Sequence, residues 1–209
     1  MSDISSLSII ILAGGLGTRI QSSIGTTPKI LALINGKPFI DYLIAWVQSS
    51  FDNIDTEIIL ATSHLHSDVK DYCTKANFNV TFSYENTPTG TLGAAYAASK
   101  QSKYDYILIL NGDTLFEQDL SVPFYYHKEK ECPVLVCKMH EGNVSKQSTY
   151  GLYEEIAGNL ATITPPIRET QKPLVSLGAL FITKSLLISN VESLKLSGRK
   201  LMIDRDLIH

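Results

Sequence analysis

Runs of apolar residues alternate with amphipathic segments along most of the chain. Residues 8–13 read Ser-Ile-Ile-Ile-Leu-Ala, and such an isoleucine-rich run is typical of a strand covered on both faces. After Pro38, whose fixed φ suits the start of a helix, apolar residues recur three and four positions apart. They are Ile40, Leu43, Ile44 and Val47. By the same criteria we predict strands at 57–61, 80–84 and 105–110 and helices at 64–75 and 91–100.

This alternation of strands and helices is typical of a parallel sheet with right-handed crossovers. After Pro133 the segments become shorter, with strands predicted at 134–138, 150–154, 160–163 and 174–182 and a last helix near 185–196. We therefore expect a three-layer, Rossmann-like α/β fold, built on a mostly parallel sheet with a small antiparallel excursion. A single core can accommodate the 209 residues, so we expect one domain over 1–209.

Composition narrows the function classes. An apolar share of 44% is enough for a sizeable core and excludes a disordered chain. Eighteen basic against 21 acidic residues leave a net charge of −3, so we expect no nucleic-acid partner. The apolar runs are too short to span a membrane, so we expect no membrane partner. Three cysteines without C-x-x-C spacing, Cys73, Cys132 and Cys137, favour a reduced, cytoplasmic location.

The turn after the first predicted strand is rich in glycine. Residues 12–19 read Leu-Ala-Gly-Gly-Leu-Gly-Thr-Arg, at the carboxyl edge of the sheet where α/β proteins bind ligands. Glycines let backbone N–H groups approach anionic oxygens, Thr18 adds a hydroxyl and Arg19 a planar fork for phosphate. Taken alone, the turn favours a phosphate site about as much as a plain strand-to-helix connection.

Two well-known phosphate motifs do not fit this turn. A P-loop requires G-x-x-x-x-G-K-[ST], and that spacing is missing from the sequence. The dinucleotide fingerprint requires a small residue where Ile20 stands. The predicted second strand also ends in Thr62-Ser63 instead of an acidic residue that would bind a ribose.

The turn, together with Pro28-Lys29 and with residues 35–38 (Asn-Gly-Lys-Pro), resembles the signature of the sugar-1-phosphate nucleotidylyltransferases. The resemblance runs from Ser8 to about Leu187. It is closest to guanylyltransferases acting on D-glycero-α-D-manno-heptose 1-phosphate, and next to those acting on mannose 1-phosphate. It implies that a sugar phosphate attacks the α-phosphorus of a nucleoside triphosphate, here GTP, and that pyrophosphate leaves. It also implies a Mg²⁺ cofactor and frequent self-association into homo-oligomers.

The resemblance assigns roles to particular residues. The catalytic residues it implies are Arg19, on the departing phosphates, Lys29, near the α-phosphate, and Asp113. Asp113 directly follows a buried strand, where a hard carboxylate can hold Mg²⁺, although Asn-Gly-Asp is also a common turn. The nucleotide-binding residues it implies are Leu12, Ala13, Gly14, Gly15, Gly17, Thr18, Glu85, Pro88, Gly90 and Thr91.

Residues 85–94 resemble the family's base-recognition loop. The Glu85 carboxylate can accept the N1–H and exocyclic amine of guanine together, which is our hypothesis for base choice. Thr87 and Thr89 suit N-capping of the next helix equally well.

The sugar half departs from the family pattern. The sugar-binding residues that the resemblance implies are Gly112, Gly151, Arg168 and Ser176. Arg168 stands near the place of the family's lysine, and Ser176 stands where the family has asparagine. We also expect a domain that is short at its C-terminus, because the family's second metal-binding Asp, in Asp-x-Gly-x-Pro, has no counterpart before His209. Asp204 and Asp206 are expected at the surface, as are His64 and His66.

Two functions remain open at this point. The first is an enzyme that makes an NDP-sugar for surface polysaccharide. The second is a nucleotide-binding regulatory relative with impaired catalysis. A variant of the first function is a transferase that uses UTP, dTTP or CTP with another sugar.

Overall fold

The computed structural model describes residues 5–15, 25–116, 118–139, 152–156, 159–162, 173–194 and 199–207. The strands of its main sheet are β1 (Ser6–Leu12), β4 (Asp55–Thr62), β5 (Thr81–Tyr84), β6 (Tyr106–Asn111), β7 (Val134–Met139), β8 (Leu152–Ile156), β9 (Asn159–Thr162) and β10 (Leu174–Thr183). The helices are α2 (Phe39–Ser50), α3 (His66–Lys75), α4 (Thr91–Ser99), α5 (Ser121–Lys130), α6 (Lys184–Ser193) and α7 (Ile203–Asp206). A 3-10 turn, η1 (Lys29–Leu31), precedes a small hairpin of β2 (Leu33–Ile34) and β3 (Lys37–Pro38).

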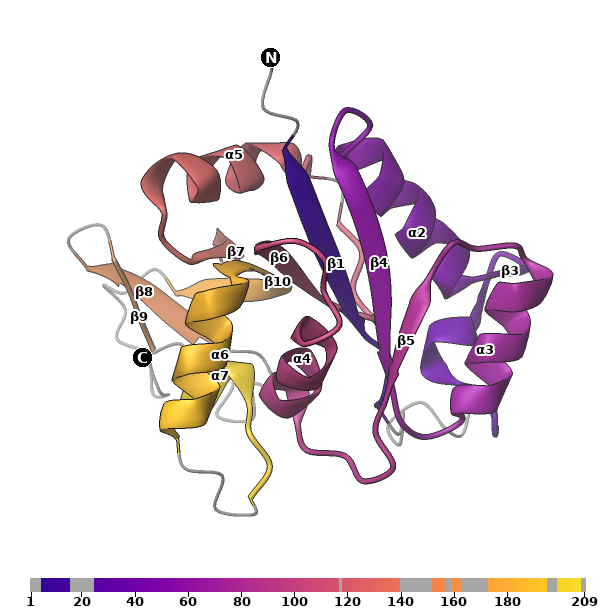
Figure 1. The fold of residues 1–209 in the computed structure, drawn as a ribbon. Coiled ribbons are helices and arrows are strands. Elements are labelled where there is room, and N and C mark those ends of the chain that lie inside the picture. The colour runs from indigo at the N-terminus through magenta and orange to yellow at the C-terminus, as the bar shows by residue number, and fades with distance from the viewer. Residues whose placement is uncertain are drawn as a thin grey trace.

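The main sheet has a parallel half and an antiparallel half (Figure 1). Its strand order is β5-β4-β1-β6-β10-β8-β9, with β7 also paired to β10. Strands β5, β4, β1 and β6 run parallel to one another, and β10 pairs antiparallel with β6. The segments after Pro133 form the antiparallel half. The expected α/β architecture with an antiparallel excursion is therefore confirmed.

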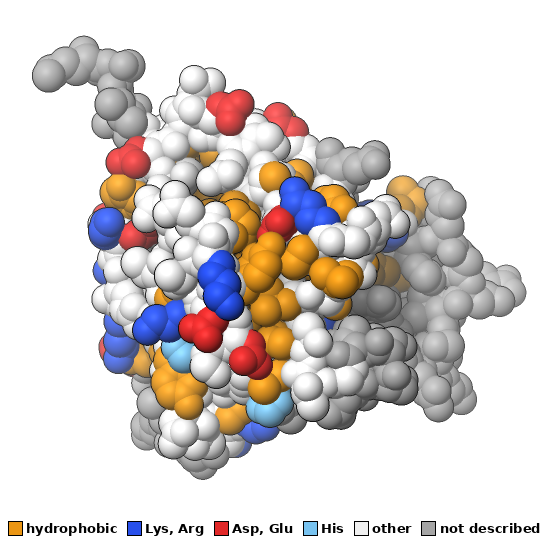
Figure 2. Space-filling view, turned by 90° about the vertical axis from the view of Figure 1, so that its right-hand side faces the viewer, with side chains coloured by type: hydrophobic (Ala, Val, Ile, Leu, Met, Phe, Trp, Pro, Cys, Tyr) orange, Lys and Arg blue, Asp and Glu red, His pale blue; other side chains and the backbone are white. Residues whose placement is uncertain are grey.

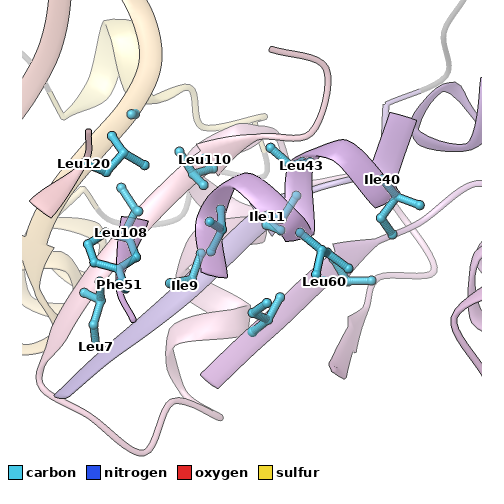
Figure 3. Close-up of a cluster of buried hydrophobic side chains, with 14 of the residues drawn as sticks. Leu7, Ile9, Ile11, Ile40, Leu43, Phe51, Leu60, Leu108, Leu110 and Leu120 are labelled. Atoms are coloured by element: carbon cyan, nitrogen blue, oxygen red, sulfur yellow. The ribbon is translucent and has the colours of Figure 1, made fainter. Parts of the chain in front are cut away.

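Side-chain alternation along the central strands divides the core into two layers. Leu7, Ile9 and Ile11 of β1 join one cluster with α2, α3 and α5, and Figure 3 shows part of this cluster beneath α2. Ile10 points to the other face, where α4, α6 and α7 pack. Because successive strand residues face opposite sides, a continuous apolar run fills both layers at once. The buried face of α2 is the predicted one: Ile40, Leu43, Ile44 and Val47.

One face of the molecule shows mixed charge over its described part. Figure 2 presents the side that lies at the right of Figure 1, where α2 and α3 are found, and Lys, Arg, Asp and Glu side chains are interspersed there around a band of apolar ones. Interspersed signs create no broad positive field, which agrees with the small net charge of −3. Among the residues that the structure describes, no helix is both long enough and apolar enough to cross a membrane.

Candidate active site

The four parallel strands end at one edge of the sheet, and the predicted site residues follow those ends. Leu12, the last residue of β1, is in register with Ala61 on one side and Asn111 on the other. Thr62 is in register with Tyr84. The residues that come next along the chain therefore converge from four separate segments, as expected for the ligand-binding edge of an open α/β sheet.

Strands β1 and β6 approach each other most closely just past their ends. The Gly112 N–H donates a 3.0 Å hydrogen bond to the Leu12 carbonyl oxygen. A Cβ atom at position 112 would lie 2.6 Å from that same oxygen, so only glycine allows this contact. The close contact places the residue after Gly112, which is Asp113, directly beside the turn that begins at Ala13.

Lys29 and Asp113 form an ion pair at this edge. Lys29 starts η1, which is anchored by the buried Ile30, and Ile30 in turn lies next to Gly112. The two charged side chains remain 36% and 40% exposed. An ion pair so open to water contributes little to stability. Both groups can therefore exchange partners, the ammonium for a phosphate and the carboxylate for a cation.

The loop at 85–90 is held at both of its ends. The Glu85 N–H donates to the Thr62 carbonyl oxygen at 2.9 Å, which extends the β4–β5 pairing by one step. The Thr89 hydroxyl donates to Glu85 Oε1 and so closes the loop on itself. Among the described residues no hydrogen-bond partner contacts Glu85 Oε2. One carboxylate oxygen at the sheet edge is thus available for a donor from a ligand.

Comparison with known proteins agrees with this geometry. The family model described as "Nucleotidyl transferase" matches residues 8–177. The chain belongs to the nucleotidyl transferase family.

Two similar proteins have the same name. The chain is 36% identical over 120 residues to a D-glycero-α-D-manno-heptose 1-phosphate guanylyltransferase of Aneurinibacillus thermoaerophilus, over 56% of this chain and 51% of that protein. It is 40% identical over 115 residues to the protein of the same name from Campylobacter jejuni, over 54% and 50%. The matched regions thus amount to about half the length of these curated relatives.

A solved structure with a similar fold carries a nucleotide analogue. The crystal structure of HddC from Yersinia pseudotuberculosis complexed with GMP-PN superposes with a TM-score of 0.72 and 26% identity. The similarity covers 96% of this chain and 84% of that chain. The fold of this chain is therefore similar to that of a protein whose crystal structure includes GMP-PN.

Several predicted site residues lie outside the described part of the chain: Gly17, Thr18, Arg19, Gly151 and Arg168. Of the remainder, the structure brings Gly14, Lys29, Glu85 and Asp113 to the same edge. Their roles in binding stay predictions.

A magnesium ion fits this edge in one way. Among the described residues, no group of three or more His, Cys, Asp or Glu side chains is placed to hold a metal. Asp113 offers one hard carboxylate, and Mg²⁺ characteristically takes one or two carboxylates, substrate phosphates and water. Asp113 is thus one donor of the kind that Mg²⁺ takes.

One histidine interaction at this edge was missed by sequence reasoning. His66 is half-buried, its Nδ1 lies 2.8 Å from the Thr62 hydroxyl, and its ring centroid is 4.8 Å from that of Tyr84. Its expected place at the surface is thus only partly right, whereas His64 is exposed as expected. The sequence signal that could have indicated this interaction is the position of His66 just after the end of a predicted strand.

Ser176, which the resemblance predicts to contact the sugar, forms a hydrogen bond within its own strand. Its hydroxyl accepts a 3.0 Å hydrogen bond from the Gly178 N–H, at a bulge where β10 shifts register against β7. Gly178 has φ +73° and lies against the Asn111 side chain. The bulge therefore brings β10 close to the residue that precedes Gly112.

The two acidic residues near the C-terminal end of the described chain differ. Asp204 is exposed, as expected, and accepts a 3.0 Å hydrogen bond from the buried Tyr153 hydroxyl. The expectation of a surface carboxylate is wrong for Asp206, whose side chain is only 4% exposed. The Arg205 guanidinium, with the Met202 N–H and Arg199, holds the pKa of Asp206 well below its usual range, although burial acts in the opposite direction. Helix α7 has only four residues, too few for a periodic pattern to reveal its buried side.

Proposed function

We propose that this protein transfers a nucleotidyl group from a nucleoside triphosphate to a sugar 1-phosphate, releasing pyrophosphate and forming an NDP-sugar. The observation that carries the proposal is the exposed Lys29–Asp113 pair at the carboxyl edge of the parallel strands, where β1 and β6 end. Family membership supports the reaction class.

The chemistry asks the protein to place two polyanions in line and to neutralise charge as it moves to the leaving group. Lys29 would bind the triphosphate near its α-phosphate, and the N–H groups at Gly14 and Gly15 would face the remaining phosphates. Asp113 would hold Mg²⁺, which supplies positive charge to the triphosphate. Separating Lys29 from Asp113 on substrate binding costs little, because the pair is already solvated.

GTP is the triphosphate we favour. Glu85 Oε2, which has no hydrogen-bond partner in the described part of the chain, can accept a guanine donor, and a carboxylate accepts both the N1–H and the amine of guanine. The guanylyltransferase names of the relatives, and the GMP-PN in the HddC crystal structure, support the same base. A heptose 1-phosphate is the proposed acceptor, on the names of two relatives, with mannose 1-phosphate as the other candidate, on the name of a third, "Putative mannose-1-phosphate guanyltransferase". A cytoplasmic location completes the proposal, and three free cysteines support it.

The test is pyrophosphate release in the presence of Mg²⁺. Each nucleoside triphosphate is paired with D-glycero-α-D-manno-heptose 1-phosphate, mannose 1-phosphate and glucose 1-phosphate. We expect release with GTP and one of the first two sugars. Asp113→Ala should lower its rate about a thousandfold. Asp105→Ala, which removes an exposed carboxylate just before the opposite end of the same strand, should leave the rate unchanged.

Two other outcomes would change the conclusion. Release with UTP, dTTP or CTP alone would keep the transferase and overturn the proposed base. If no pair releases pyrophosphate while one nucleotide still raises the melting temperature, the protein is a nucleotide-binding relative without turnover.

A further inference from the structure

Residues 199–207 pack against the start of α4, more than a hundred positions earlier in the chain (Figure 1). The Leu201 N–H donates to the Thr89 carbonyl oxygen at 2.8 Å, and the Leu92 N–H donates to the Leu201 carbonyl oxygen at 3.0 Å. The Ile203 N–H donates to the Thr91 hydroxyl at 3.1 Å. This 199–207 segment therefore holds the junction between the 85–90 loop and α4.

The segment supplies a cap that α4 lacks in its own sequence. The first N–H groups of any helix have no partner within the helix. The N-cap residue here is Gly90, which has no side chain to accept them, and the Leu201 carbonyl takes the Leu92 N–H instead. Gly90 has φ +96°, and a Cβ there would lie 2.9 Å from Leu201 N. The close contact thus depends on glycine in this conformation.

Asp206 holds Leu201 in place from both sides. Its Oδ2 accepts hydrogen bonds from the Met202 N–H at 2.7 Å and from Arg205 Nη2 at 2.9 Å. The same Arg205 nitrogen donates to the Lys200 carbonyl oxygen at 2.8 Å. A salt bridge from Arg199, at 2.8 Å, completes the cluster. One nearly buried carboxylate therefore ties down both neighbours of Leu201.

These contacts continue to Glu85, the residue that we propose contacts the base. Leu201 holds the Thr89 backbone, and the Thr89 hydroxyl is bonded to Glu85 Oε1. We infer that Asp206 is a positioning residue for nucleotide selection: through Leu201 and Thr89 it orients the Glu85 carboxylate toward the base. This inference rests on the proposed function, because it assumes that Glu85 contacts a nucleotide.

The first experiment separates selection from general stability. Asp206→Asn should raise KM for GTP about tenfold, the usual scale for one charge-assisted hydrogen bond, with kcat changed less than about twofold. The preference for GTP over UTP should fall by the same factor. The matched control is Glu57→Gln, another nearly buried carboxylate, near the start of β4. It should lower the melting temperature and leave the GTP/UTP preference unchanged.

A double-mutant cycle tests the route through Thr89. Thr89→Val removes the hydroxyl that contacts Glu85. If Asp206 acts through Thr89, the loss of GTP preference in the double variant should equal that of Thr89→Val alone, whereas independent effects would add. Additive losses would overturn the inference.

Hydrogen exchange in the ligand-free protein tests the structural half without any substrate. In Asp206→Asn the amides of Leu92 and Leu201 should exchange at least tenfold faster than in the wild type, and Glu57→Gln should leave them unchanged relative to global unfolding. Unchanged exchange at both amides would overturn the inference. So would faster exchange with an unaltered GTP/UTP ratio. If wild-type protein turns over no triphosphate, the proposed function fails and base selection with it, while exchange still decides whether Asp206 holds Leu201.

Discussion

The two edges of the parallel sheet carry similar residues in opposite situations. At the starting edge, the Glu57 side chain is 9% exposed and accepts hydrogen bonds from the Ser8 hydroxyl and the Lys103 N–H, each at 2.6 Å. Ser102 donates to the same Ser8 hydroxyl at 2.7 Å. At the finishing edge, Asp113 is 40% exposed, and its charge is balanced by Lys29.

The difference separates a structural use of charge from a functional one. A nearly buried carboxylate that accepts several hydrogen bonds stabilises the fold, because removing it leaves those donors without their acceptor. An exposed ion pair adds little to stability, and its members can bind something else. The strand direction explains which edge is which, since ligands of open α/β sheets bind at the carboxyl ends.

The largest expected effect tests the finishing edge, at Asp113. Asp113→Ala should lower kcat/KM about a thousandfold, the scale for removing one essential electrostatic group, and shift the free energy of unfolding by no more than about 0.5 kcal/mol. Steady-state kinetics and urea denaturation measure the two quantities. A stability loss comparable with that of a core substitution would remove the contrast between the edges.

At the starting edge we expect a large loss of stability and no loss of activity. Glu57→Ala leaves the Ser8 hydroxyl and the Lys103 N–H without their acceptor, which should lower the free energy of unfolding by about 2–3 kcal/mol. Substrate turnover per folded molecule should stay at the wild-type value. A large fall in kcat of the fully folded variant would show that the starting edge also affects the active site.

A smaller effect tests base recognition at the finishing edge. Glu85→Gln replaces one acceptor oxygen by a donor, so guanine loses one of its two contacts. We expect kcat/KM for GTP to fall about tenfold relative to UTP. Asn86→Ala, at the next position, is the control and should leave the ratio unchanged. An unaltered preference in Glu85→Gln would exclude this residue from base recognition.

The smallest effect concerns a buried group away from both edges. Burial lowers the pKa of His127, while its hydrogen bond to the Cys132 carbonyl acts in the opposite direction, and among the described residues its Nε2 has no partner. Because the unfolded chain takes up the proton first, His127 stabilises the fold fully above about pH 6.5 and progressively less below it. Denaturation at pH 7.5 and 5.5 should show a smaller acid-induced loss in His127→Gln. An identical loss would mean that other groups cause it.

Local pattern predicted the elements of the parallel half well. The buried face of α2 and the strand ends that carry Lys29's partner Asp113 follow from periodicity and from the residues that stop each strand. The four strands of the antiparallel half were also predicted, each to within about two residues of its observed bounds. Helix α5 buries only Phe124 and His127, too few for a clear periodic signal.

The sequence by itself determined the α/β order, the glycine-rich edge and the resemblance that names the reaction class. All three rest on neighbouring residues, because strand alternation, helical spacing and turn chemistry act over a few positions. Only the tertiary structure decided that Lys29 meets Asp113, that Asp206 is buried and that Leu201 caps α4. Each of these features depends on the path of the whole chain, which brings distant segments together at the sheet. A local periodic pattern carries no information about that path.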